Sequence, residues 1–199
     1  MFAFLAGYAA GLLHVFSGPD HLAAVAPLAS DRVRRQWLTG LQWGIGHFAG
    51  VLLIAALLLV VKEQLPLDAI SAYSERLVGA SLILIGGWGL RRAWVLRGAG
   101  AEVHTHAGAS FAMGTIHGLA GSSHLFGVLP ALLLPSRVQS MAYLAGFGLG
   151  AVTGMTAFSA AMGLAARRLG RRHPRSSHGL LYASSAAALV VGGVWLVGR

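Results

Sequence analysis

The stretch Gly11-Leu-Leu-His14-Val-Phe-Ser-Gly18-Pro19-Asp20-His21-Leu-Ala-Ala-Val-Ala-Pro27 places a carboxylate and two imidazoles inside an otherwise apolar segment. A charged side chain at the centre of a membrane helix costs about 2.5–3.5 kcal/mol on insertion scales, so we expect Asp20 to face a cavity or a partner group rather than lipid. His14 and His21 flank the carboxylate on both sides along the chain. Their presence favours a cation as the partner of Asp20.

The composition is that of an integral membrane protein. Of 199 residues, 56% are hydrophobic and only 11% are charged, whereas soluble domains carry about 25% charged residues. The formal net charge of +9 does not indicate a nucleic-acid partner, because most of the arginines lie in short connections between apolar stretches, where they report membrane topology. The chain has no cysteine, which excludes disulfides and thiolate metal sites.

Six stretches are long enough to cross a bilayer, for which about 20 apolar residues are needed. We therefore predict an all-α polytopic membrane protein with spans at about 2–29, 37–61, 71–93, 108–134, 138–166 and 178–198. Arginine-rich connections at 30–36, 94–107 and 167–177 alternate with connections poor in arginine. The positive-inside rule places these three in the cytoplasm and both termini outside, in a bacterial inner membrane.

The sequence also repeats itself. Offsets of 103 and 104 residues align the following pairs: Gly11–His14 with Gly114–His117, Gly18 with Gly121, His21 with His124, Pro27 with Pro130, and Trp43–Gly46 with Phe147–Gly150. Each half would hold three helices, an odd number, so the halves must insert with opposite orientation, as in many secondary transporters. We predict one membrane domain over 1–199, with repeats at about 1–93 and 108–199 joined by a cytoplasmic loop at 94–107.

The first and fourth spans are expected to be interrupted. In a regular helix, His14 and His21 would be separated by two turns, about 10.5 Å along the axis, which is too far for them to share one ion. Pro19 removes a backbone donor and clashes with the preceding turn, so the helix should kink or unwind at Gly18-Pro19. Such a break would let His14, Asp20 and His21 converge. In the second half, Gly121-Ser-Ser is the corresponding weak point, although it has neither proline nor carboxylate.

Imidazole and carboxylate groups within the spans form a candidate metal site. A single buried histidine is more often structural, but five of them together with an aspartate indicate metal ligation. The predicted ligands are His14, Asp20, His21, His47, His117 and His124. Nitrogen and oxygen ligands without sulfur suit nickel, cobalt, zinc or copper(II), whereas magnesium and calcium prefer oxygen alone. Ligand type does not choose among the first four metals.

At these residues the chain resembles the nickel/cobalt transporter superfamily, most closely its short HupE/UreJ-like and UreH-like six-helix branches. His14, a five-residue spacer and Asp20-His21 are similar to the first-helix motif of that family, and Gly46-His47 to its next element. The acidic residue that the family carries after a Gly-Met element does not follow Gly154-Met155, and the Asp-Thr-Ala-Thr-Glu-like segment is missing. The resemblance implies transport of divalent nickel or cobalt.

The leading interpretation is a secondary transporter that moves Ni²⁺ or Co²⁺ inward, with the ion bound as substrate and no prosthetic group. An exporter on the same scaffold is the alternative, and His104 and His106 in a cytoplasmic loop mildly favour it, although a solvated loop is the commoner explanation for that pair. A haem-binding carrier and an accessory membrane subunit are weaker alternatives. An intramembrane metalloprotease is disfavoured because no H-E-x-x-H motif occurs, so we expect no enzyme. The predicted partners are the metal ion and the bilayer, and the sequence is compatible with a homo-oligomer.

Overall fold

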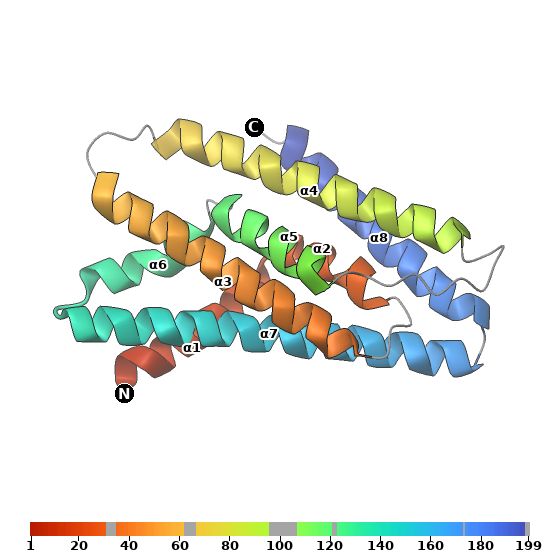
Figure 1. Ribbon diagram of the computed structural model, residues 1–199, viewed down its shortest axis with the longest axis horizontal. Coiled ribbons are helices and arrows are strands. Elements are labelled where there is room, and N and C mark those ends of the chain that lie inside the picture. The colour runs from red at the N-terminus through yellow and green to blue at the C-terminus, as the bar shows by residue number, and fades with distance from the viewer. Residues whose placement is uncertain (31–34, 62–66, 96–106, 121–122, 173, 198–199) are drawn as a thin grey trace.

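The computed structural model is all-α (Figure 1). It describes residues 1–30, 35–61, 67–95, 107–120, 123–172 and 174–197. Within these ranges lie eight helices: α1 (Phe2–Ser17), α2 (Pro19–Ser30), α3 (Gln36–Val61), α4 (Leu67–Val95), α5 (Ala107–Ala120), α6 (Ser123–Leu133), α7 (Arg137–Arg172) and α8 (Pro174–Val197). Figure 1 shows the four long helices α3, α4, α7 and α8 extended along the long axis of the molecule, with the short helices α2 and α5 between them.

The predicted interruption of the first span is confirmed. Helix α1 ends at Ser17 and α2 begins at Pro19, and the two helices are bent by 73° relative to each other. Gly18 between them has an extended backbone (φ −88°, ψ 102°), and its N–H donates to the carbonyl of His14 at 3.1 Å. Proline is well placed at the first position of α2, because its missing N–H would have no partner within the helix there.

The fourth predicted span, at about 108–134, likewise corresponds to two short helices, α5 and α6. Residues 121 and 122, where we expect the second interruption, lie outside the described residues. Pro130 lies inside α6, as Pro27 lies inside α2.

Three described helices are long and apolar enough to cross a membrane, within Gln36–Ala56, Arg137–Arg171 and His178–Val197, and the bent α1–α2 pair is a fourth candidate if its two helices form one broken span. The other two predicted crossings stay predictions. Helix α4 carries Glu75 and Arg76 near one end and Arg91 and Arg92 near the other, so the apolar run between them is short for a span of about 20 residues. Helices α5 and α6, taken separately, are too short.

The outer surface supports a membrane environment. Large apolar side chains are exposed on the long helices, among them Leu84 and Trp94 on α4, Met141 on α7 and Val190 on α8. A soluble monomer rarely exposes apolar surface on this scale. The candidate spans and this apolar surface together show that the protein is an integral membrane protein.

The predicted connection at 167–177 is wrong in part, because α7 continues to Arg172 and α8 begins at Pro174. Arginine is a good helix former, so a run of arginines does not end a helix. Arg167 is also held in place, since its guanidinium donates to the side-chain carbonyl of Gln36 at 2.6 Å. The hydroxyl of Ser159 donates to the Gln36 backbone carbonyl at 2.5 Å. These bonds fix the start of α3 against the second half of α7.

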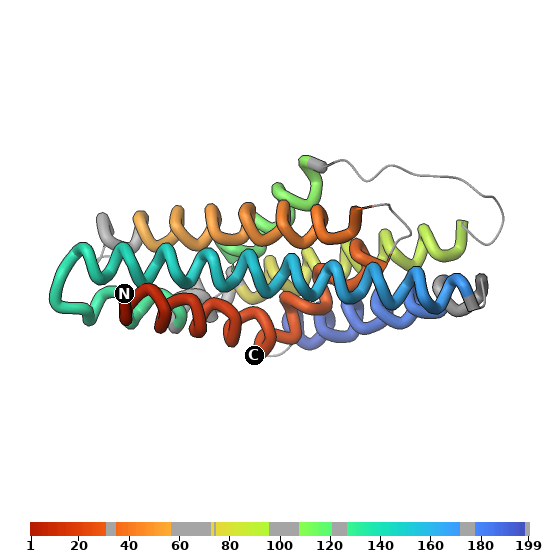
Figure 2. The backbone as a smooth tube through the Cα atoms, turned by 90° about the horizontal axis from the view of Figure 1, so that it is seen from below, coloured from red at the N-terminus to blue at the C-terminus, as the bar shows by residue number. Residues whose placement is uncertain are grey.

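Helix α1 packs against α7 (Figure 2), and α3 packs against α5, through backbone contacts at glycine. A Cβ on Gly11 would collide with the carbonyl of Phe147, and a Cβ on Gly114 would collide with the carbonyl of Trp43. Small residues at helix interfaces allow this close approach in membranes. The two contacts correspond in the sequence, because Gly114 follows Gly11 by 103 residues and Phe147 follows Trp43 by 104.

A second pair of contacts follows the same correspondence. Gly150 on α7 lies against the carbonyl of Tyr8 on α1, and Gly46 on α3 lies against the carbonyl of Phe111 on α5. Gly150 and Gly46 differ by 104 positions, and Phe111 and Tyr8 by 103. The interfaces α1–α7 and α3–α5 therefore use equivalent positions of the two sequence halves.

The close contact at Gly114 gives a test of this packing. We expect Gly114→Ala to lower the free energy of unfolding by about 1–3 kcal/mol, because the added methyl forces α3 and α5 apart. The matched control is Gly108→Ala on the same helix, where a Cβ would meet nothing within 4 Å. The control should be as stable as wild type or slightly more stable. Unfolding of purified protein in detergent, followed by circular dichroism, measures both, and equal stability of the two variants would contradict the close approach.

Candidate metal centre

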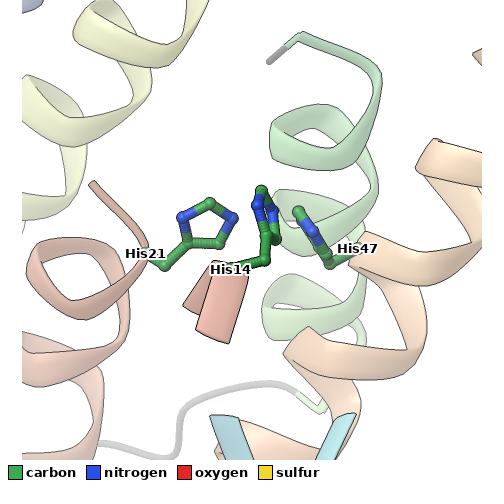
Figure 3. Close-up of side chains that lie close together, drawn as sticks. All are labelled: His14, His21 and His47. Atoms are coloured by element: carbon green, nitrogen blue, oxygen red, sulfur yellow. The ribbon is translucent and has the colours of Figure 1, made fainter. Parts of the chain in front are cut away.

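Four imidazoles from four helices meet at the break between α1 and α2. His14 is in the last turn of α1, His21 in the first turn of α2, His47 on α3 and His117 on α5. His21, His47 and His117 are at most 1% exposed, and His14 is half-buried. Figure 3 shows the rings of His14, His21 and His47 turned toward one another. The structure thus brings together four of the five predicted histidine ligands.

The helix break produces this convergence. The ring centroids of His14 and His21 are 4.5 Å apart, whereas two turns of straight helix would separate the two residues by about 10.5 Å. His47 lies 5.8 Å from His14 and 4.9 Å from His21, and His117 lies 4.9 Å from His21. His21 is therefore at the centre of the cluster.

Asp20 connects two of the imidazoles. Its Oδ1 lies 3.1 Å from Nδ1 of His21, and its Oδ2 lies 3.2 Å from Nε2 of His117. The carboxylate is 2% exposed, so these contacts offset part of the cost of burying its charge. With protons on His21 Nδ1 and His117 Nε2, both rings donate to Asp20, and the opposite nitrogen of each ring keeps its lone pair.

Two groups of side chains could each hold a metal ion. We call them the imidazole set (His14, His21 and His47) and the carboxylate set (Asp20, His21 and His117), and within each set the potential ligand atoms lie within 4.8 Å of one another. Nitrogen and oxygen ligands of a four-coordinate ion at about 2.0–2.2 Å lie roughly 3.4 Å apart. The separations of Asp20 from the two imidazoles are close to that value. If the ring protons of His21 and His117 move to the opposite nitrogens, a small shift would let these same atoms bind one ion.

Aromatic side chains border the cluster on two sides, and the sequence analysis did not assign them to the site. The Phe147 ring lies 5.4 Å from that of His14, and the Trp43 ring lies 5.8 Å from that of His117. These contacts correspond in the repeat, since His14 aligns with His117 and Trp43 with Phe147. Trp43 precedes His47 by one helical turn, so both side chains lie on the same face of α3. That spacing is the sequence signal that could have assigned Trp43 to the site. Such rings exclude water from a bound ion.

The remaining candidate residues either lie apart from the cluster or belong to the part of the chain that the structure does not describe. The His124 side chain lies outside the described residues, although its backbone belongs to α6. His104 and His106 lie outside the described residues too. The hydroxyl of Ser17 is exposed and donates to the carbonyl of His14 at 3.4 Å. Met155 of the Gly154-Met155 element is part of the hydrophobic core around Trp43.

No family model and no solved structure matches this chain, but three curated proteins do. Two are the Arabidopsis thaliana proteins Chloroplast protein FOR GROWTH AND FERTILITY 2, which is 36% identical over 94% of the chain, and Chloroplast protein FOR GROWTH AND FERTILITY 1, which is 34% identical over 94%. The third is the urease accessory protein UreH of Bacillus sp. (strain TB-90), which is 28% identical over 79% of the chain and 75% of UreH. The chain is a distant homologue of these proteins.

The homology does not make the proteins equivalent in length. The chain spans about half the length of the two plant proteins, 54% and 56% respectively. Because those two are chloroplast proteins, a bacterial inner membrane stays a prediction for this chain, and so does the orientation of its termini.

The break at Gly18 gives a test of the cluster geometry. A Cβ at Gly18 would collide with His21 Nδ1 and lie 2.9 Å from Asp20 Oδ1. Because outer contacts that orient a ligand are worth roughly 10–100-fold in metal affinity, we expect Gly18→Ala to weaken Co²⁺ binding by about that factor. Isothermal titration of purified protein measures the affinity. Ser17→Ala, at the exposed neighbouring position, is the control and should bind like wild type. Unchanged affinity in Gly18→Ala would contradict the assigned geometry.

Proposed function

We propose that this protein is a secondary transporter that carries divalent transition-metal ions, Ni²⁺ or Co²⁺, across the membrane in the inward direction. The observation that carries the proposal is the buried cluster of four imidazoles and one carboxylate at a broken helix. Ionisable residues inside membrane proteins mark ion pathways. A discontinuous helix near the middle of the bilayer is the usual place for a transporter's binding site.

Ligand chemistry and homology support the choice of metal. Histidine and carboxylate ligands suit nickel, cobalt, zinc and copper(II). Within that group, the resemblance of His14, Asp20-His21 and Gly46-His47 to the nickel/cobalt transporter superfamily favours Ni²⁺ or Co²⁺. The homologue UreH is named a urease accessory protein, which is in line with a membrane protein related to nickel uptake rather than with an enzyme. The metal is the substrate of the protein and not a resident cofactor.

The cluster supplies what a dehydrated divalent ion needs. Imidazole nitrogens replace its water ligands, and the Asp20 carboxylate compensates part of its charge in a region where charge is costly. Only neutral imidazole can bind the ion, so acidification on one side of the membrane should release it. Asp20 is the group through which proton movement could be coupled to the ion.

The equivalent packing of α1 with α7 and of α3 with α5 supports an inverted-repeat mechanism. We propose that the six predicted spans form two inverted three-helix repeats. In such transporters one repeat rocks against the other around a fixed site, which opens alternately to the two sides. His14 and His21 come from the first half of the sequence and His117 from the second, so relative motion of the halves would change the ligand set.

The geometry gives no support to a haem-binding carrier, the alternative from another class. Haem ligands must lie on opposite faces of a macrocycle. The rings of His21, His14 and His47 instead pack edge to face at centroid distances of 4.5–4.9 Å around His21. This arrangement of His21 with His14 and His47 is therefore unlike a pair of axial haem ligands.

Replacement of Asp20 tests the proposal. We expect Asp20→Asn to reduce ⁶³Ni²⁺ uptake to the level of empty vesicles, because the substitution keeps the shape of the side chain but removes its charge. The assay uses proteoliposomes of known protein orientation, so it also reports whether the ion moves inward or outward. His178→Ala on α8 is the control, because that histidine belongs to neither metal-binding group. Undiminished uptake by a folded Asp20→Asn protein would refute the assignment.

A further inference from the structure

His21 belongs to both groups that could hold a metal ion. It completes the imidazole set with His14 and His47, and it completes the carboxylate set with Asp20 and His117. An imidazole has two nitrogens on opposite sides of its ring. Nδ1 of His21 faces Asp20 at 3.1 Å, and Nε2 lies on the opposite side of the ring. Figure 3 shows the His21 ring edge-on to His14 and His47.

From this shared ligand we propose that one transported ion occupies the two sets in succession and that His21 passes it from one to the other. The inference rests on the proposed transport function and adds an order of events to it. In the imidazole set the ion is bound by Nε2 of His21, while the proton on Nδ1 stays hydrogen-bonded to Asp20. In the carboxylate set the ion is bound by Nδ1, and the single ring proton of His21 is on Nε2. The ring is neutral in both states. The hand-over therefore needs one proton to leave Nδ1 for water and one proton from water to bind Nε2, and the net proton count of the ring does not change.

Electrostatics allows only one ion at a time. Two divalent charges on opposite nitrogens of one imidazole would repel each other strongly in a buried site, where the effective dielectric constant is low. Arrival of a second ion would therefore expel the first. We expect one bound ion per chain, although the ligand atoms suffice for two positions.

Burial and charge assign a different role to each set. His14 is half-buried, whereas all three members of the carboxylate set are at most 2% exposed. The imidazole set is neutral and the carboxylate set carries the negative charge of Asp20. An ion would therefore lose or regain water at the imidazole set and be held most firmly in the carboxylate set.

A double-mutant cycle separates this relay from one composite site that uses all five side chains at once. His14→Ala damages only the imidazole set, and His117→Ala damages only the carboxylate set. Asp20→Asn is then added to each variant, and Ni²⁺ binding to the full-length protein in detergent is measured by titration. The relay predicts that Asp20→Asn weakens binding by at least about tenfold in the His14→Ala protein, where the ion depends on the carboxylate set. The same change should leave affinity within about threefold in the His117→Ala protein, because the amide oxygen of the introduced asparagine can still accept the hydrogen bond from Nδ1 of His21.

Two further readouts complete the test. Nickel-edge X-ray absorption should show oxygen from a carboxylate in His14→Ala and imidazole ligands without it in His117→Ala, and His21→Ala should bind no Ni²⁺. His117→Asn replaces His117→Ala if the alanine variant does not fold, as judged by size-exclusion chromatography. Equal losses on adding Asp20→Asn to both backgrounds, or two Ni²⁺ bound per wild-type chain, would overturn the relay. Wild-type protein that transports Ni²⁺ under those outcomes would retain the proposed function, whereas absence of both binding and transport would refute that function itself.

Discussion

The two contacts of the Asp20 carboxylate, one to His21 beside it and one to His117 on α5, are the constraint on which the site depends. A carboxylate enclosed by apolar helices is tolerated only when hydrogen-bond donors or cations compensate its charge. Here one oxygen faces each imidazole, and one of these contacts joins Asp20 to His117, 97 residues away in the sequence. The first and second halves of the chain are thereby connected at the place where the ion is proposed to bind.

The helix break at Gly18-Pro19 and the glycine contacts between helices bring Asp20 and His117 together. Gly18 and Pro19 end one helix and start the next at a 73° bend, and so Asp20 and His21 lie at a helix start instead of on a helix face. Glycines on α5 and α3 let each helix lie directly against backbone carbonyls of the other. This close approach places His47 and His117 near His21. The same packing recurs between α1 and α7. Glycine at the helix interfaces thus explains both the close helix packing and the convergence of the proposed metal ligands.

Much of this arrangement could be predicted from the sequence, because its causes are local. Proline after glycine in an apolar stretch indicates a break, and histidines around a lone aspartate indicate a site. The pairing of Asp20 with His117 could not be predicted, since it depends on how distant helices pack. The extension of α7 through its arginines could not be predicted from charge alone, because a run of arginines is compatible with a helix and Arg167 is fixed by a contact with Gln36 on another helix. Trp43 and Phe147 were recognised only as repeat positions, and their contact with the imidazoles emerged from the packing.

The most direct test of the central claim is a crystal structure of the protein grown with Ni²⁺, with an anomalous difference map collected at the nickel absorption edge. The account predicts one strong peak per chain within ligand distance of His21, beside either His14 and His47 or Asp20 and His117, and a bend at Gly18-Pro19. A peak elsewhere in the molecule, such as at His104 and His106, or a continuous helix through Pro19 would contradict it.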